Sequence, residues 1–240
     1  MKAQALRWIV AGSFLISCQL TAEPLNDLQA RLASLHNDRP TRIRVDVELE
    51  HRGSAPLHLN KNKKRGKATI EYGPEGVKMI ESRWQGRSSR FSFWSSAKND
   101  PADETPLLGD VQALDLVDPA RMMETLLEGA TLLSDEPVTW QEQPARLLVI
   151  RPGPLAPSAE GEPLDLLAKI WLDESGVPLA LERSMEFRLG PLAATGLQTL
   201  TFQQVDGRLL AATAQESNSG AALAVLRSKD VRKMKVTAVK

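Results

Sequence analysis

The sequence predicts a mainly β protein (α+β), in which one antiparallel sheet of about eleven strands is combined with two helices. Most of the chain after residue 40 has the patterns of strands and turns, with strict alternation of apolar and polar residues at 41–50. The stretch 118–133 differs, because its apolar residues recur at helical spacing. A single amphipathic helix in a β-rich chain must lay its apolar face on a sheet, so we expect this helix to cover one sheet face.

The composition is that of an ordinary globular domain. The chain has 240 residues, of which 42% are hydrophobic and 25% charged, and this length suffices for one domain with a large core. Lys plus Arg equals Asp plus Glu, at 30 each. Residues 1–22 hold Lys2 and Arg7 but no acid, so the rest has 28 cations and 30 acids, a net charge of −2. This balance gives no global electrostatic reason to bind nucleic acid.

Residues 1–22 have the pattern of an export signal, followed by a single domain at 23–240. Lys2 and Arg7 form a positive start, and residues 8–16 form an apolar run that is too short for a stable membrane anchor. The pattern predicts export, and therefore a periplasmic or outer-membrane-anchored protein of a Gram-negative-type cell.

Two processing sites are open at the end of this signal. Leu15-Ile16-Ser17-Cys18 resembles the bacterial lipobox, in which the cysteine becomes a lipidated N-terminus and Cys18 would be a membrane anchor. The alternative is cleavage after the small residue Ala22, which removes Cys18 with the signal. Gln19 follows the cysteine, and by analogy with lipoproteins it favours delivery to the outer membrane.

The folded part offers little of the chemistry that marks enzymes or metal sites. Cys18 is the only cysteine, so residues 23–240 have no disulfide, thiolate nucleophile or cysteine-based metal site. The spacings of His36, His51 and His58 match neither a zinc finger nor a helical zinc-binding pair. No nucleophile elbow, phosphate-binding glycine loop or dinucleotide fingerprint occurs. We therefore expect a non-catalytic protein without a metal or cofactor.

Charged residues surround the first predicted strand. Residues 41–50 alternate strictly, and Asp46, Glu48 and Glu50 fall on their polar face. We interpret these acids as a solvated row that pairs with cations of the next strand, and a catalytic or cation-binding row is the alternative. The cations come from residues 60–67, which we interpret as the mobile tip of a hairpin. Their alternative role is contact with anionic lipid head groups or phosphate.

The mid-chain helix is the best-marked helix of the sequence. Asp118 is a good N-cap, and Pro119 follows at the first helical position, where its missing N–H has no cost. One broad face then carries only apolar residues: Met122, Met123, Leu126, Leu127, Ala130 and Leu133.

Shorter patterns predict the remaining elements. Before the mid-chain helix they predict a helix at 24–36, strands at 68–72, 77–84 and 90–94, and a loop at 97–107. After it they predict a loop at 152–163 and strands at 138–140, 145–150, 166–172, 178–189, 195–205, 209–214, 222–226 and 231–239. The Asp206-Gly207 dipeptide favours a two-residue type I′ turn, and we expect sequential antiparallel pairing throughout.

This order of elements resembles the lipoprotein-carrier superfamily of LolA, LolB and LppX-like proteins. The resemblance covers most of residues 24–240 and is carried by five short stretches: 27–32, 116–119, 170–173, 176–178 and 205–209. It implies a strongly curved sheet, or half-barrel, with the mid-chain helix as a plug on its concave face. It also implies an apolar cavity for acyl chains.

On this basis we expect lipid acyl chains or a lipidated protein as the partner, in a carrier or outer-membrane lipoprotein-sorting-like role. The expected ligand-binding residues are Met122, Met123, Leu126, Leu127, Trp171 and Phe187. Methionine suits a surface that repacks around variable chains, although core packing also explains it. One alternative is an envelope protein–protein interaction module. Another is a periplasmic hydrolase with dispersed carboxylates, which a buried acid pair with raised pKa values would favour.

Overall fold

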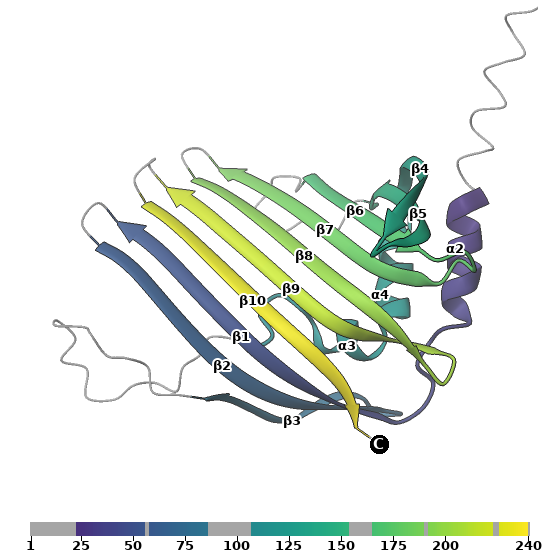
Figure 1. The fold of residues 1–240 in the computed structure, drawn as a ribbon, viewed down its shortest axis with the longest axis horizontal. Coiled ribbons are helices and arrows are strands. Elements are labelled where there is room, and N and C mark those ends of the chain that lie inside the picture. Colours follow the sequence, from purple (N-terminus) through teal and green to yellow (C-terminus); the bar gives the residue numbers. More distant parts are fainter. Residues whose placement is uncertain are drawn as a thin grey trace, which may run out of the picture.

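A computed structural model shows the fold (Figure 1) and describes six stretches of the chain: residues 23–55, 58–85, 107–153, 165–189, 192–222 and 226–239. Four predicted segments lie wholly or mostly outside the described residues: the export signal with Cys18, the strand at 90–94, and the loops at 97–107 and 152–163.

One antiparallel sheet dominates the structure. Its ten strands are β1 Thr41–Ala55, β2 His58–Gly73, β3 Gly76–Gln85, β4 Thr131–Trp140, β5 Gln143–Arg151, β6 Asp165–Leu172, β7 Pro178–Leu189, β8 Leu192–Val205, β9 Arg208–Ala222 and β10 Leu226–Val239. The strand order is β3-β2-β1-β10-β9-β8-β7-β6-β5-β4, and the long strands curve together across the molecule (Figure 1). The predicted fold class, a mainly β protein with a curved antiparallel sheet and helices, is confirmed.

Pairing is sequential except at one place. β1 pairs with β10, from Arg42 opposite Val239 to Ser54 opposite Arg227, so the first and last strands of the sheet region lie side by side. Among the described residues, β3 and β4 are therefore the two edges of an open sheet, although they follow each other along the chain. The expectation of sequential pairing throughout was wrong at this point.

The sheet has one apolar and one polar face. On β1, Ile43, Val45 and Val47 are at most 3% exposed, whereas the residues between them are exposed or half-buried. We call the face that carries these three residues the inner face and the opposite one the outer face. The inner face packs against the helices, and the two mid-chain helices lie behind the sheet in Figure 1.

The acids of β1 lie on the outer face and pair with cations of β2, as predicted. Lys63 lies 2.6 Å from Glu48, and Lys67 lies 3.8 Å from Asp46. The hydrogen bond from Lys63 holds the pKa of Glu48 below its usual value. The prediction of a mobile hairpin tip at 60–67 was wrong, because these residues lie within β2 and pair with β1. The acids of β1 supply the counter-charges that hold a basic run in a strand.

Three helices are described. α2 Glu23–Ala33 opens the domain and buries Leu28 and Leu32. α3 Ala113–Val117 and α4 Pro119–Leu127 follow each other in mid-chain and are separated only by Asp118. The predicted N-cap is confirmed, because Asp118 accepts a 3.4 Å hydrogen bond from the backbone N–H of Arg121.

The mid-chain helix is shorter than the sequence predicts. It ends at Leu127, and Gly129 has a φ of +66°, which turns the chain out of the helix. β4 begins at Thr131, so Ala130 and Leu133 are not part of the helical face. Leu133 is the extra residue at a register shift of β4 and is 46% exposed. The apolar periodicity therefore ran past the true end of the helix.

The turn at Asp206-Gly207, with φ values of +52° and +81°, is the predicted type I′ turn.

The end of the sheet next to the helices contains the core. The largest fully buried side chains come from both helices and sheet: Leu28, Leu32, Leu35, Ile43, Ile70, Leu116, Met123, Leu148, Ile150, Ile170, Leu181 and Leu200.

Candidate functional site

The candidate site is the inner face of the sheet together with the mid-chain segment that covers it. We call Leu107–Leu127 the lid; it contains α3 and α4. A row of apolar residues in mutual register crosses the sheet beneath it: Val47, Met234, Ala214, Leu200, Leu181, Ile170 and Leu148. Each of these side chains is at most 3% exposed. The inner face is thus a broad apolar surface that the lid covers.

The apolar face of α4 supplies the residues that fill it. Met123 and Leu127 are 0% and 3% exposed, and Met122 and Leu126 are each 7% exposed. Arg121 and Thr125 of the same helix are exposed. A helix of nine residues is too short to be stable alone, so contact with the sheet holds α4 in place.

A polar row crosses the inner face directly beside the apolar one. Arg183 of β7, Gln198 of β8, Glu216 of β9 and Arg232 of β10 are in register on four adjacent strands. The Arg232 Nη1 donates to Glu216 Oε2 at 2.9 Å, and Arg183 donates to the side-chain oxygen of Gln198. Arginine on the inner face of β7 interrupts an otherwise apolar pattern, and its partners on the neighbouring strands explain why it is tolerated.

The lid is attached to the sheet through this polar row. The backbone N–H of Asp110 donates to Glu216 at 3.1 Å, and the Asn218 amide donates to the Asp110 carboxylate at 3.0 Å. Farther along the lid, Arg183 donates to Asp115 at 3.3 Å. These polar contacts place the lid over the apolar row in one register.

Two glycines allow the lid to lie this close. Gly109 has a φ of +63°, and a Cβ atom there would lie 1.4 Å from Nη1 of Arg232. Gly66 of β2 makes room for the Leu107 side chain, because a Cβ at Gly66 would lie 2.3 Å from Cδ1 of Leu107. At both positions a larger residue would displace these side chains, and at Gly109 the positive φ also favours glycine.

Two carboxyl groups of this network have raised pKa values. Burial raises the pKa of Asp115 and of Glu216, and in both cases it outweighs the neighbouring arginine. Such a pair is what the hydrolase alternative required. Each carboxylate, however, faces its own arginine and has a side-chain exposure of only 6–7%. The arrangement is that of structural ion pairs that fasten one segment to another.

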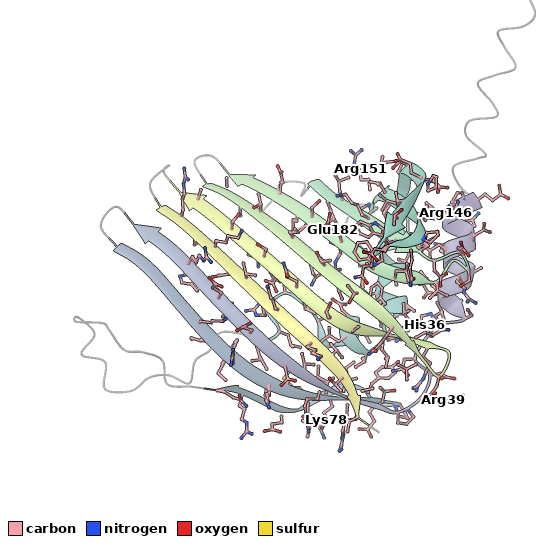
Figure 2. All side chains as sticks on the ribbon, in the orientation of Figure 1. His36, Arg39, Lys78, Arg146, Arg151 and Glu182 are labelled. Atoms are coloured by element: carbon pink, nitrogen blue, oxygen red, sulfur yellow. The ribbon has the colours of Figure 1, made fainter. Side chains whose placement is uncertain are left out.

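The start of α4 is held by the connection between α2 and β1. His36 lies 3.3 Å from the Asp118 carboxylate through Nδ1 and 2.9 Å from the Glu124 carboxylate through Nε2. The buried Asn37 amide donates to the carbonyl of Val117 at 2.9 Å. Figure 2 shows His36 at the end of the sheet beside the helices. The lid is therefore fixed at the N-terminal end of α4.

Beyond the polar row the inner face becomes more open. The next row in register contains Met185, Gly196, Asn218, Asp230 and His51. Met185 is 37% exposed, and the ring of His51 lies 2.5 Å from the Asp230 carboxylate. Because the polar row separates this part from the apolar one, the inner face has an amphiphilic layout.

The structure brings together four of the six predicted ligand-binding residues, Met122, Met123, Leu126 and Leu127, on the buried face of α4. Trp171 lies instead on the outer face, where its ring is 4.7 Å from that of Trp140 at an angle of 39°. Phe187 lies in β7 opposite Ala194, and its side chain is outside the description. Whether any of them binds a ligand stays a prediction.

The polar row was not predicted. It is assembled by register across four strands, so no local pattern in the sequence contains it. Arg183, the one charged residue on the apolar face of its predicted strand, was the only signal available.

The described stretches hold no cluster of three or more His, Cys, Asp or Glu side chains that could bind a metal ion. Among the helices that the structure describes, none has the length and apolarity needed to cross a membrane.

Comparison with known proteins identifies similar structures but no family. No family model matches the chain, and the comparison by sequence with curated proteins also found no match. A crystal structure assigned as an outer membrane lipoprotein-sorting protein domain from Vibrio parahaemolyticus is similar, with a TM-score of 0.32 and 15% identity over 90% of this chain and 92% of that one. A DUF1329 family protein from Desulfovibrio piger has a TM-score of 0.33 and 10% identity, over 90% and 91%. At these values neither similarity identifies a ligand or a site residue.

Proposed function

We propose that this is an exported, non-catalytic envelope protein that binds the acyl chains of a lipid or of a lipidated protein on the inner face, beneath the lid. The observation that carries the proposal is the layout of that face. A broad apolar row is covered by the lid, which includes the short, amphipathic α4, and the polar row with Arg183 and Arg232 runs along its rim. Apolar surface beside fixed polar groups fits an amphiphile.

The energetics permit exchange of α4 for an acyl chain. Exposing the four apolar side chains of α4 costs roughly 6–12 kcal/mol, at about 1.5–3 kcal/mol each. An acyl chain of roughly fourteen methylenes gains about 11 kcal/mol on burial, at about 0.8 kcal/mol per methylene. The two values are comparable, so a ligand of ordinary length offsets the displacement of α4.

The polar contacts of the lid suit such an exchange. Asp110 and Asp115 hold the lid through three hydrogen bonds to side chains of the sheet. When the lid moves away, Arg183 loses its Asp115 partner and can donate to the polar head group of an amphiphile, which would lie at the rim. Arginine is well suited to carboxylate and phosphate groups because its guanidinium donates in a planar fork.

Displacement of a fluorescent fatty acid by unlabelled lipid tests the proposal directly. We expect saturable binding by the processed protein, and co-purifying lipid in native mass spectrometry. The variant Leu126→Asp places a charge on the buried face of α4 and is expected to alter both binding and lid packing. Thr125→Asp, on the exposed face of the same helix, is the matched control and is expected to bind as the parent does.

A lipid-free protein that binds no fatty acid would refute the proposal, as would unchanged stability and binding in Leu126→Asp. A mutated protein that simply unfolds is distinguished by its circular dichroism, and Leu126→Ala then provides the milder change. Mass spectrometry of the mature N-terminus decides separately whether Cys18 is lipidated or the chain is cut after Ala22.

A further inference from the structure

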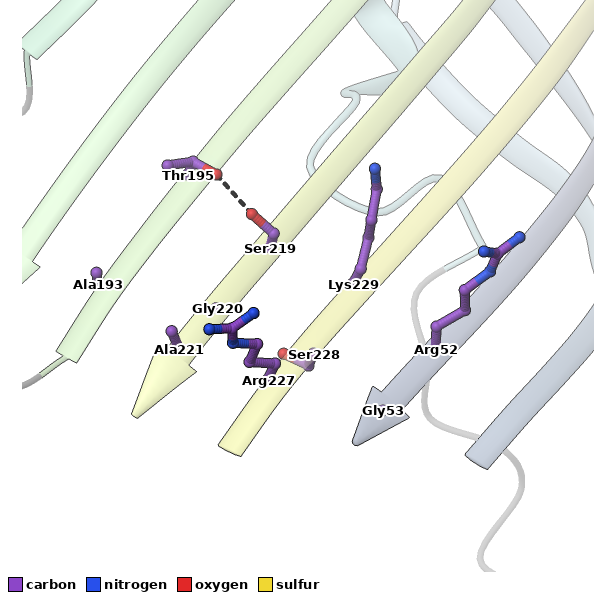
Figure 3. Close-up of a pocket in the computed structure, with 10 residues that line it drawn as sticks. All are labelled: Arg52, Gly53, Ala193, Thr195, Ser219, Gly220, Ala221, Arg227, Ser228 and Lys229. Atoms are coloured by element: carbon purple, nitrogen blue, oxygen red, sulfur yellow. Dashed lines mark hydrogen bonds between the residues drawn. The ribbon is translucent and has the colours of Figure 1, made fainter. Parts of the chain in front are cut away.

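A pocket of about 420 Å³ lies on the outer face, near the ends of β1, β8, β9 and β10 (Figure 3). It is on the side of the sheet opposite the lid and at the other end of the strands from the core. No part of the proposed acyl-chain site contributes to it.

The pairing of the four strands builds the pocket from two rows of side chains. Ala193 of β8 and Ala221 of β9 are in register with Arg227 of β10. The neighbouring row places Thr195 and Ser219 next to Lys229 of β10. Small side chains on two strands beside long side chains on the adjacent strands leave a hollow on the sheet.

The long side chains around this hollow are all cationic. Lys229 of β10 pairs with Arg52 of β1, and Arg227 extends from β10 toward β9 in Figure 3. Arg52 donates to Glu50 at 2.7 Å, and its side chain is 63% exposed. Arg227 and Lys229 are exposed and have no acidic partner among the described residues. None of the ten residues that line the pocket is acidic. The local charge is therefore positive, although the whole domain is nearly neutral.

The pocket also offers hydroxyl donors. The hydroxyl oxygens of Thr195 and Ser219 lie 2.6 Å apart, so one of them donates to the other (Figure 3). The second O–H of the pair remains able to donate to a bound group. Two cations without an acidic partner among the described residues, a third cation shared with Glu50, and one hydroxyl donor surround the hollow, and they match the acceptor oxygens and negative charge of a phosphate.

We propose that this pocket binds a phosphate group, either on the head group of an anionic lipid or on a soluble phosphate ester. The proposal is independent of the acyl-chain site, because the two lie on opposite faces and share no residue. In an envelope protein that handles lipid, an outer-face phosphate site would hold the protein on an anionic membrane surface with the lid facing away from it.

Two measurements separate the two sources of phosphate. Co-sedimentation with phosphatidylglycerol vesicles, compared with phosphatidylcholine vesicles, tests the lipid head group. Titration with inorganic phosphate, followed by the backbone amide signals of Thr195, Ser219 and Gly220, tests the soluble ion. The full chain is used as the cell processes it, with Cys18→Ser so that no lipid anchor binds the vesicles by itself.

Three variants locate the binding. The double variant Arg227→Gln/Lys229→Gln removes two cations of the pocket and is expected to weaken binding about tenfold or more. Lys233→Gln/Lys235→Gln removes the same charge from the outer face of the same strand, away from the pocket, and is expected to change binding much less. Ala221→Gln fills the hollow without changing the charge and is expected to weaken binding as well.

Each outcome either supports or overturns the proposed phosphate site. Preference for phosphatidylglycerol that the pocket variants abolish supports the lipid head group as the ligand. Saturable amide shifts with inorganic phosphate, without vesicle preference, support the soluble ester. Equal losses in both double variants, or unchanged binding in Ala221→Gln, would show general surface charge and overturn the proposal, as would no binding of either kind. Fatty-acid binding beneath the lid is unaffected by any of these results.

Discussion

Gly109 is the residue on which the close fit of the lid depends most directly. Its φ of +63° strains any other residue, and a Cβ atom would collide with the buried Arg232–Glu216 pair. We expect Gly109→Ala to lower the free energy of unfolding by about 1–3 kcal/mol from strain alone, and by more from the clash. Urea denaturation measures the change.

Gly176→Ala is the matched control for this substitution. Gly176 also has a positive φ, of +79°, but a Cβ atom there would meet nothing within 4 Å. It therefore reports the backbone cost alone. Equal losses of unfolding free energy in Gly109→Ala and Gly176→Ala would mean that a Cβ atom at residue 109 does not clash with the ion pair.

Removing one partner of the Arg232–Glu216 pair should lower the free energy of unfolding strongly, whereas replacing both partners by apolar residues should lower it much less. Arg232→Met leaves a buried carboxylate without its cation, which typically costs about 3–5 kcal/mol. The double variant Arg232→Met/Glu216→Leu removes both charges and is expected to recover most of that loss, as a double-mutant cycle would show. If the double variant is as unstable as Arg232→Met, the unpaired carboxylate of Glu216 is not the cause of the lost stability.

The raised pKa of Glu216 makes a prediction about pH. Because the folded state holds the proton more tightly than the unfolded state, stability from this group is fully present below the ordinary carboxyl pKa and is lost as pH rises through the raised value. Unfolding measured from pH 4 to pH 8 should therefore show the parent losing stability relative to Glu216→Gln as pH rises. Parallel curves would contradict the raised pKa.

At the scale of elements, α4 depends on the contacts at its first turn. Asp118 accepts from Arg121, pairs with His36 and is 1% exposed. Asp118→Ala is expected to cost about 1–2 kcal/mol, in the range for the loss of a helix cap. Amide hydrogen exchange should show faster exchange confined to the lid. Glu128→Ala, at the exposed far end of the helix, serves as the control and should leave exchange unchanged.

Elements with a clean hydrophobic period were predictable from the sequence, and elements defined by their neighbours were not. β1 followed from strict alternation, and the turn at Asp206-Gly207 from its dipeptide. The distal half of β9 from Gln215 to Gly220 is polar or small, so it had no strand signal and exists because β8 and β10 pair with it. The end of α4 was missed because apolar residues of β4 happened to continue the helical period.

At the scale of the whole molecule, the pairing of β1 with β10 joins distant parts of the chain. No local pattern predicts this contact, because it forms only when the first and last strands are brought together in the folded sheet. The same holds for the polar row, in which Arg183 and Arg232 meet partners on other strands only after the sheet has formed. The sequence could therefore predict the apolar face of α4, but not the polar contacts that hold the lid.

Removal of β10 should prevent folding of the remaining chain. Without residues 226–239 the β1 strand loses its pairing with the second half of the sheet, and the buried Met234 and Val236 are missing from the core. We expect near-random far-ultraviolet circular dichroism for the shortened chain. A cooperative unfolding transition in that chain would mean that the two parts of the sheet are separate folding units.

Among the described strands, β3 and β4 each have a neighbouring strand on one side only, and such edges favour aggregation. An edge strand offers unpaired backbone groups, on which a second molecule can add a strand. β4 carries Pro137, which has no N–H to donate, beside the exposed Asp135 and Glu136. β3 is interrupted by an irregular register at Ile80 and carries exposed charges on both sides of it. These features of β3 and β4 would limit strand addition by a second molecule if the lid of the proposed acyl-chain site were displaced.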